Sequence, residues 1–259
     1  MTLFRQRIVL VSLLLLIVPS VCLAQQKSLN NDRAIVRPRT VVLVRRGAIA
    51  RQFPSRTRAK VRYPVISGLS DLTVLRRVQE MLQVKNIFET SLAEYKQDSW
   101  LEEFDYTVHY NQNHILDITF TQTGTAAYPD THTKHFAIDL RDGTTIQASE
   151  VFASDKLSAL AKLVDAKLQA ELMKINKDNS GPGSDPEDAR ISGEAGEALE
   201  FNVENLNDLS VGAKGITFLY DAGYPHAIQA FEPEGQYFFS YAELKQFIKP
   251  DGLLGRFVK

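Results

Sequence analysis

Four of the five histidines lie between residues 109 and 135: His109, His114, His132 and His135. Neutral imidazole is the commonest metal ligand in proteins, so such a cluster could mark a metal site. Side chains alternate between the two faces of a strand, however, so His132 and His135 point in opposite directions, and His109 lies on a polar face. We therefore expect solvent-facing histidines on strands, and no metal ion and no cofactor.

Asp130 and His132 could act as an acid and a base beside a Ser or Thr hydroxyl. Hydrolysis also needs a positioned nucleophile and an oxyanion hole, and the spacing supplies neither. The sequence has no Gly-x-Ser-x-Gly elbow, phosphate-binding loop, dinucleotide fingerprint or His-Glu-x-x-His helix. The sequence predicts a protein that is not an enzyme, and a hydrolase with an unrecognised site is one alternative.

A Tyr-Pro dipeptide recurs three times, at Tyr63, Tyr128 and Tyr224. Proline holds the residue before it in an extended conformation, and tyrosine offers a large contact area at a low entropy cost. Two such loops could frame a recognition surface, or each could only shape its own loop. The predicted ligand-binding residues are Tyr128, Pro129, Asp130, Tyr224, Pro225 and His226.

Apolar and polar residues alternate with a period of two in several segments, which is typical of strands with one buried face. The longest such region predicts an antiparallel meander from about 103 to 147, with a tight turn at Asp142-Gly143. We expect further strands at 41–44, 60–66, 216–220 and 227–231.

Spacings of three and four residues predict helices over 72–82, 86–97, 157–175 and 241–248. In the first helix, Ser70 and Asp71 are candidate N-caps, and Leu72, Leu75, Val78 and Leu82 form the inward stripe. Helices and antiparallel strands occur in blocks, so the fold class is α+β: an antiparallel sheet meander with packed helices in two small lobes. The Gly- and Pro-rich stretch 179–192 is a candidate lobe boundary.

The N-terminus has the three-part pattern of a secretory signal. Arg5 and Arg7 precede an apolar run over 8–18, and small residues lead to an expected cleavage after Ala24. An uncleaved membrane anchor is the alternative, although a bilayer span needs about 20 residues. The only cysteine, Cys22, lies within the signal, so the mature chain has no disulfide. We expect a secreted or periplasmic protein.

Charge is unevenly distributed along the chain. Residues 25–62 carry eleven Lys and Arg against one acid, Asp32, whereas the rest of the mature chain is acidic. Such an arm can fold back on its own acidic body or bind an anionic surface such as lipid or cell-wall polymer. Nucleic acid is a poor partner for an exported protein. The arginines expected to meet an anionic surface are Arg45, Arg46, Arg51, Arg56 and Arg58.

Several stretches resemble a known family, in the same order along the chain. They are 61–69, 106–111, 116–120, 124–129, 138–143, 150–152, 215–220 and 241–245. Together they resemble the extracellular module shared by the lysozyme-binding anti-sigma factor RsiV and the peptidoglycan deacetylase PdaC, over about residues 60–250. In that family the loop at 124–129 usually reads Gly-Gly-Ala-His; here it reads Gly-Thr-Ala-Ala-Tyr-Pro, so no role of that histidine carries over.

The resemblance implies an α+β fold and a role at the cell envelope. It brings no catalytic site, because the deacetylase chemistry belongs to a separate domain, and we expect no sigma-binding portion before the signal. The leading hypothesis is an exported, non-catalytic envelope protein that binds a lysozyme-like protein or peptidoglycan fragments. A structural protein that docks through its basic arm is the second alternative. The expected division is a signal peptide (1–24), a basic leader with the first strands (25–60), and lobes at 61–178 and 193–259.

Overall fold

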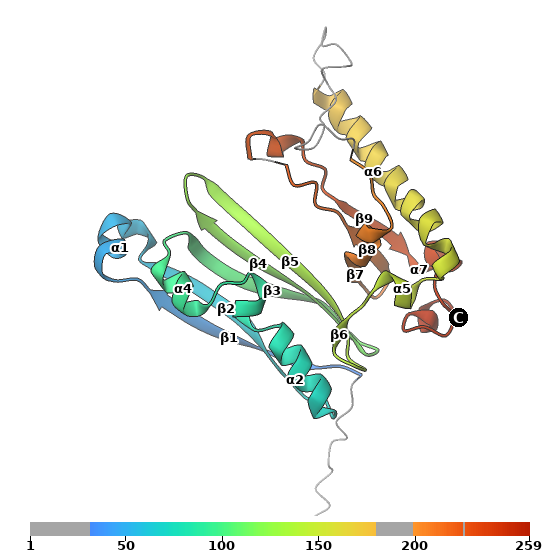
Figure 1. Cartoon of the computed structure of the whole chain (residues 1–259), viewed down its shortest axis with the longest axis horizontal. Coiled ribbons are helices and arrows are strands. Elements are labelled where there is room, and N and C mark those ends of the chain that lie inside the picture. Colours follow the sequence, from blue (N-terminus) through green and yellow to red (C-terminus); the bar gives the residue numbers. More distant parts are fainter. Residues whose placement is uncertain (1–31, 180–198, 225) are drawn as a thin grey trace, which may run out of the picture.

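The computed structural model describes residues 32–179, 199–224 and 226–259. The chain has an α+β fold with a six-stranded and a three-stranded sheet, as the sequence predicts (Figure 1). The expected signal segment and most of the Gly- and Pro-rich stretch lie outside the described residues. Among the helices that are described, none combines the length and the apolar character needed to span a membrane.

The first sheet contains six strands in the order in which the chain makes them. All neighbours are antiparallel except β2 and β3, which are parallel. The predicted meander is confirmed by β3 to β6. The strands are β1 (Ile35–Val44), β2 (Arg58–Ser67), β3 (Leu101–Gln112), β4 (Ile115–Thr125), β5 (Pro129–Asp139) and β6 (Thr144–Thr145).

Four helices belong to the first lobe: α1 (Gly47–Gln52), α2 (Leu72–Met81), α3 (Val84–Ile87) and α4 (Leu92–Gln97). The Asp71 carboxylate caps α2 by accepting hydrogen bonds from the amides of Thr73 and Val74. The prediction that Leu72 faces inward is wrong: it is 70% exposed, because the face that α2 buries is the one that carries Val74 and Val78. The single helix expected over 86–97 is two short helices, separated at Glu89, whose φ is 54°.

The second lobe is built on a three-stranded antiparallel sheet of β7 (Leu209–Val211), β8 (Gly215–Leu219) and β9 (Gln236–Ser240). The strand expected at 227–231 is wrong, because that segment is the 3-10 helix η4 (His226–Phe231), and β9 is the partner of β8. Gly235 immediately precedes β9, at the point where its pairing with β8 begins. Its φ is 62°, and a Cβ there would lie 1.9 Å from the carbonyl oxygen of Tyr220. The turn therefore requires glycine.

Helices α5 (Ala148–Val151), α6 (Leu157–Asn179) and α7 (Tyr241–Leu244) surround this second sheet. The capping box of Ser240 and Glu243 begins α7 as predicted, but the helix ends at Leu244 and not near residue 248. Short 3-10 turns complete the chain: η1 (Pro54–Arg56), η2 (Ser154–Lys156), η3 (Glu204–Asn207) and η5 (Gly255–Phe257).

Two hydrophobic cores lie on opposite faces of the first sheet. One core joins the large side chains of β3 and β4, such as Phe104 and Phe120, to α2, α3 and α4. The other core joins the second sheet to α5 and α6, and Tyr110, Ile115 and Ala137 reach it from the first sheet. Helix α6, which the sequence assigns to the first lobe, therefore packs with the second sheet. Figure 1 shows α6 on the outer side of the second lobe, away from the first sheet, and β5 on the side of the first sheet that faces the second lobe.

The basic arm forms β1, α1 and the start of β2, and one of its arginines is buried. Arg45 is 2% exposed, and its guanidinium donates to the carbonyls of Arg56 (2.7 Å) and Leu101 (2.6 Å). The prediction that Arg45 meets an anionic surface is therefore wrong, because its hydrogen bonds tie the end of β1 to β3. Arg46, Arg51 and Arg58 are exposed.

Candidate ligand-binding cleft

A cleft of about 1080 Å³ separates β5 from the segment that runs from Leu219 to Gln236. Tyr128 lines it from the β4–β5 turn, Pro129 and Asp130 line it from the start of β5, and Tyr224 lines it from the connection after β8. Four of the six predicted site residues therefore lie around one cavity. Pro225 lies outside the described residues, and His226 is the first residue of η4.

The two tyrosines differ in how they meet this cleft. Tyr128 is 64% exposed at the tip of a hairpin closed by a hydrogen bond from the amide of Ala126 to the carbonyl of Tyr128. Tyr224 is buried, and its amide donates to the Glu232 carboxylate at 3.3 Å. Burial and the nearby Glu232 raise the pKa of the Tyr224 hydroxyl. Tyr128 thus presents a contact surface, whereas Tyr224 is part of the opposite wall.

The cleft is strongly acidic. Among the lining residues that the structure describes, five are carboxylates and the only lysine or arginine is Lys134. Protein atoms around the Asp208 carboxyl displace water from it and so raise its pKa, whereas the nearby His135 lowers that pKa. The carboxylates are those of Asp130, Asp208, Asp221, Glu232 and Glu234. A cleft with low-dielectric walls focuses such a field, so it favours a cationic ligand.

Aromatic side chains accompany the acids. Trp100 stands beside His132, with ring centroids 5.3 Å apart, and Tyr128 and Tyr220 also line the cleft. Such rings provide large contact areas, and tryptophan and tyrosine faces also attract cations. The lining is therefore suited to a basic polypeptide, and rings such as Trp100 and Tyr128 also suit a sugar.

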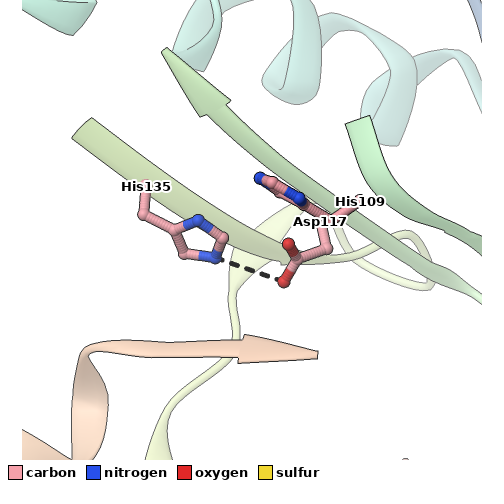
Figure 2. Close-up of side chains that lie close together, drawn as sticks. All are labelled: His109, Asp117 and His135. Atoms are coloured by element: carbon pink, nitrogen blue, oxygen red, sulfur yellow. Dashed lines mark hydrogen bonds and ion pairs between the residues drawn. The ribbon is translucent and has the colours of Figure 1, made fainter. Parts of the chain in front are cut away.

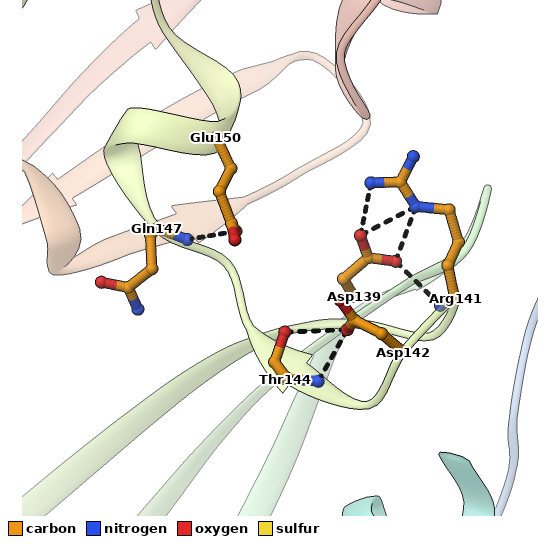
Figure 3. Close-up of polar contacts among 6 residues, drawn as sticks. All are labelled: Asp139, Arg141, Asp142, Thr144, Gln147 and Glu150. Atoms are coloured by element: carbon orange, nitrogen blue, oxygen red, sulfur yellow. Dashed lines mark hydrogen bonds and ion pairs between the residues drawn. The ribbon is translucent and has the colours of Figure 1, made fainter. Parts of the chain in front are cut away.

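The connection from β5 to α5 carries the chain from the first sheet into the second lobe, and polar contacts hold it at three points (Figure 3). The buried Asp139 carboxylate binds the Arg141 guanidinium at 2.5 and 2.8 Å. Asp142 accepts from the amide and hydroxyl of Thr144, which forms the predicted tight turn at Gly143. Glu150 then accepts from the amide of Gln147 at the start of α5. These contacts help to set the position of the second lobe.

A second polar cluster lies on the face of the first sheet that the second lobe covers (Figure 2). His109, Asp117 and His135 come from β3, β4 and β5, and their ligand atoms lie within 4.8 Å of one another. Spacing along the chain did not reveal this cluster, because it depends on the strand register. Thr119 pairs with His135, and a bulge between Val108 and Tyr110 places His109 beside them.

Each of the three residues in this cluster already makes a hydrogen bond. Asp117 is fully buried, and it accepts from the Ser210 hydroxyl (3.0 Å), the Val211 amide (2.6 Å) and His135 Nε2 (3.2 Å). His135 Nδ1 and His109 Nε2 meet the Thr119 hydroxyl at 2.8 and 2.9 Å. Two imidazoles and a carboxylate could hold a zinc-like ion, but only by exchanging these hydrogen bonds for metal bonds. The contacts made by Asp117 join β4 to β7, so the cluster fastens one lobe to the other.

The order Asp117, His135, Thr119 resembles an acid–base–hydroxyl arrangement, but its setting does not favour nucleophilic catalysis. β4 is an interior strand, hydrogen-bonded to β3 and β5 on both sides. The backbone amides near Thr119 are therefore engaged in the sheet, whereas an oxyanion hole needs amides aimed at the substrate. The other pair considered from the sequence, Asp130 and His132, is 3.2 Å apart and exposed.

No family model matches the sequence, and no curated protein is significantly similar to it. Two solved structures share its fold. A DUF3298 family protein from Pseudomonas aeruginosa PAO1 aligns with a TM-score of 0.52 at 12% identity, over 85% of this chain and 97% of that chain. A member of the same family from Bacteroides fragilis NCTC 9343 gives 0.50 at 13% identity, over 86% and 95%. At these identities the likeness shows the fold alone, which is the two-lobed α+β architecture that the sequence predicts.

Proposed function

We propose that this chain is an exported, non-catalytic protein of the cell envelope that binds a basic polypeptide, of the lysozyme kind, in the cleft between its lobes. The observation that carries the proposal is the cleft itself. It brings together the two Tyr-Pro loops and surrounds them with five carboxylates. The signal pattern over residues 1–24 supports export, and the resemblance to the RsiV and PdaC module supports a role at the envelope.

Charge favours a basic protein over other ligands. Opposite potentials speed association and exclude like-charged competitors, even where they add little to the final affinity. Asp130, Asp221 and Glu234 are exposed in the cleft, so they are available to a cationic partner. A basic protein of the lysozyme kind would complement the acidic lining of this cleft.

A cell-wall glycan is the second candidate, and Trp100 is the observation that favours it. This ring stands at the cleft beside His132 and near exposed Asp130, an arrangement that allows a sugar to stack on the ring while the carboxylate accepts from a hydroxyl. Docking on an anionic surface through Arg46, Arg51 and Arg58 would use α1 and β2, which do not line this cleft.

Calorimetry with the mature chain tests the proposal. We expect binding to lysozyme, and a loss of about tenfold or more in affinity when Asp130→Lys and Glu234→Lys are combined. Glu80→Lys, on the exposed side of α2, is the matched control and should bind as the wild type does. Binding to muropeptides alone would identify the glycan as the ligand, and unchanged lysozyme affinity in the double variant would exclude the cleft as its site.

A further inference from the structure

β5 has a free edge that faces the cleft. Along its whole length, one edge pairs with β4, from Thr125↔Pro129 to Ile115↔Asp139. On the other edge, β6 pairs only with Ile138 and Asp139. Within the described part of the chain, the outer edge from Pro129 to Ala137 therefore has no partner strand.

Two hydrogen bonds show which backbone groups point outward. The amide of Leu140 donates to His114 on the β4 side (2.7 Å), so even-numbered residues of β5 face β4. The carbonyl of Ala137 accepts from Ile146 on the opposite side (2.8 Å), so odd-numbered residues face outward. The register has no shift along this strand pair, and the alternation therefore continues to the hairpin tip.

Thr131, Thr133 and His135 thus present their amides and carbonyls to the free edge. The amide of Thr131 already donates to its neighbour Asp130 at 2.7 Å. The amides of Thr133 and His135, with the three carbonyls, are oriented to pair with a further strand. In an antiparallel pair, a residue of this orientation exchanges both of its hydrogen bonds with the residue opposite.

The cleft runs along this edge. Every residue from Ala126 to Ala137 lines it, although successive side chains point to opposite faces of the sheet. A cavity over one face would contact every second residue only. Residues 126–134 are also all exposed, as expected where both faces and the edge meet solvent.

We infer that an extended basic segment of the polypeptide ligand binds as an additional strand along the outer edge of β5. The inference rests on the proposed function and specifies the form of its ligand. An exposed edge of this length invites pairing with any other strand, and proteins usually protect such edges. Here residues of the second lobe, such as Leu219 and Gln236, line the same cleft as this edge. The carboxylates of the cleft, Asp208 and Glu234 among them, select basic side chains on the added strand.

Peptides test the backbone pairing apart from the charge. The probe is a short end-blocked peptide of alternating lysine and valine, compared with an analogue in which esters replace the amides along both edges. The two carry the same charge, but the analogue has no N–H groups to donate. Strand addition predicts that the analogue binds about tenfold more weakly, since each lost hydrogen bond costs about 1 kcal/mol. Equal affinities would overturn the inference.

The protein side of the pairing is tested at Thr133. Its amide points outward, so Thr133→Pro removes a donor from the free edge while leaving the hydrogen bonds to β4 in place. We expect this variant to bind the peptide about tenfold more weakly, whereas the matched control Thr133→Val, which keeps the amide, should bind as the wild type does. Peptide binding should also slow hydrogen exchange at the amides of Thr133 and His135.

The outcomes separate the inference from the proposed function. If lysozyme binds but Thr133→Pro and Thr133→Val show equal affinity, strand addition is wrong and the cleft remains a binding site. If no basic polypeptide binds, both are wrong. A dimer of the free protein that Thr133→Pro dissociates would show that the edge pairs with a second copy, which also overturns the inference.

Discussion

Two His–Asp pairs, each with its histidine on β5, have the same separation and different surroundings. In His132–Asp130 and in His135–Asp117, the Nε2–Oδ2 distance is 3.2 Å. The side chains of the first pair are 52% and 45% exposed, whereas those of the second are 13% and 0% exposed. His132 and His135 are only three residues apart on β5, yet the first pair is exposed to solvent and the second is buried between the two lobes.

The difference shows that the surroundings of a pair, more than its distance, determine what it does. Asp117 also binds Ser210 and Val211 of the second lobe, so its carboxylate is a joint between sheets. Asp130 and His132 stand in the cleft beside Trp100, where a ligand can reach them. The buried pair should matter for folding, and the exposed pair for binding.

The largest expected effect is that of Asp117→Ala. The substitution leaves the Val211 amide, the Ser210 hydroxyl and His135 without their buried acceptor, so we expect a loss of about 3 kcal/mol in the free energy of unfolding. Asp130→Ala should change it by less than about 0.5 kcal/mol. Urea denaturation of both variants measures the contrast. Equal losses would mean that the buried cluster does not fasten the lobes.

Double-mutant cycles should give a smaller but cleaner difference. Replacing His135 and Asp117 by alanine, singly and together, should yield a coupling energy of about 2 kcal/mol, as for a buried hydrogen bond to a charged group. The cycle for His132 and Asp130 should yield about 0.5 kcal/mol or less, because water competes for both groups. A larger coupling in the exposed pair would reverse the assignment of roles.

Asp130→Asn should act on binding and not on stability. Removing one exposed charge from the cleft should lower the affinity for lysozyme about threefold at low salt, mainly through the association rate, and the effect should shrink as salt screens the field. Stopped-flow association at several ionic strengths measures this, with Glu80→Gln as the control. An effect that persists at high salt would point to a direct hydrogen bond in place of steering.

The sequence predicts the alternating strands and the cleft loops better than the polar cluster. Period-two alternation identifies β3 and β4 because each strand has one apolar face. Of the Tyr-Pro dipeptides, those at Tyr128 and Tyr224 indicate the cleft loops, whereas Tyr63 lies within β2. Neither signal contains the register between strands, so the meeting of His109 with His135 and Asp117 could not be derived. The segment 227–231 is predicted as a strand for a related reason: its apolar residues follow a turn after β8, but the partner of β8 is β9, which begins after Gly235.

The smallest expected effect concerns pH, and it falls on Asp208. Its carboxyl lies in the cleft with a pKa raised by the surrounding protein, so it becomes protonated at a higher pH than an ordinary aspartate. Acidification from neutral pH should therefore weaken binding of a basic ligand. Asp208→Asn should bind more weakly at neutral pH, and its affinity should change less with pH.

The free energy of unfolding responds to pH in the opposite direction. A raised folded-state pKa of Asp208 favours the native state at low pH, and that contribution is lost as the pH rises through this pKa. Calorimetric titrations at several pH values measure the first effect and urea denaturation the second. If Asp208→Asn leaves the pH profile of binding unchanged, the titration of Asp208 does not affect the ligand, and the other carboxylates of the cleft, such as Asp130, attract it.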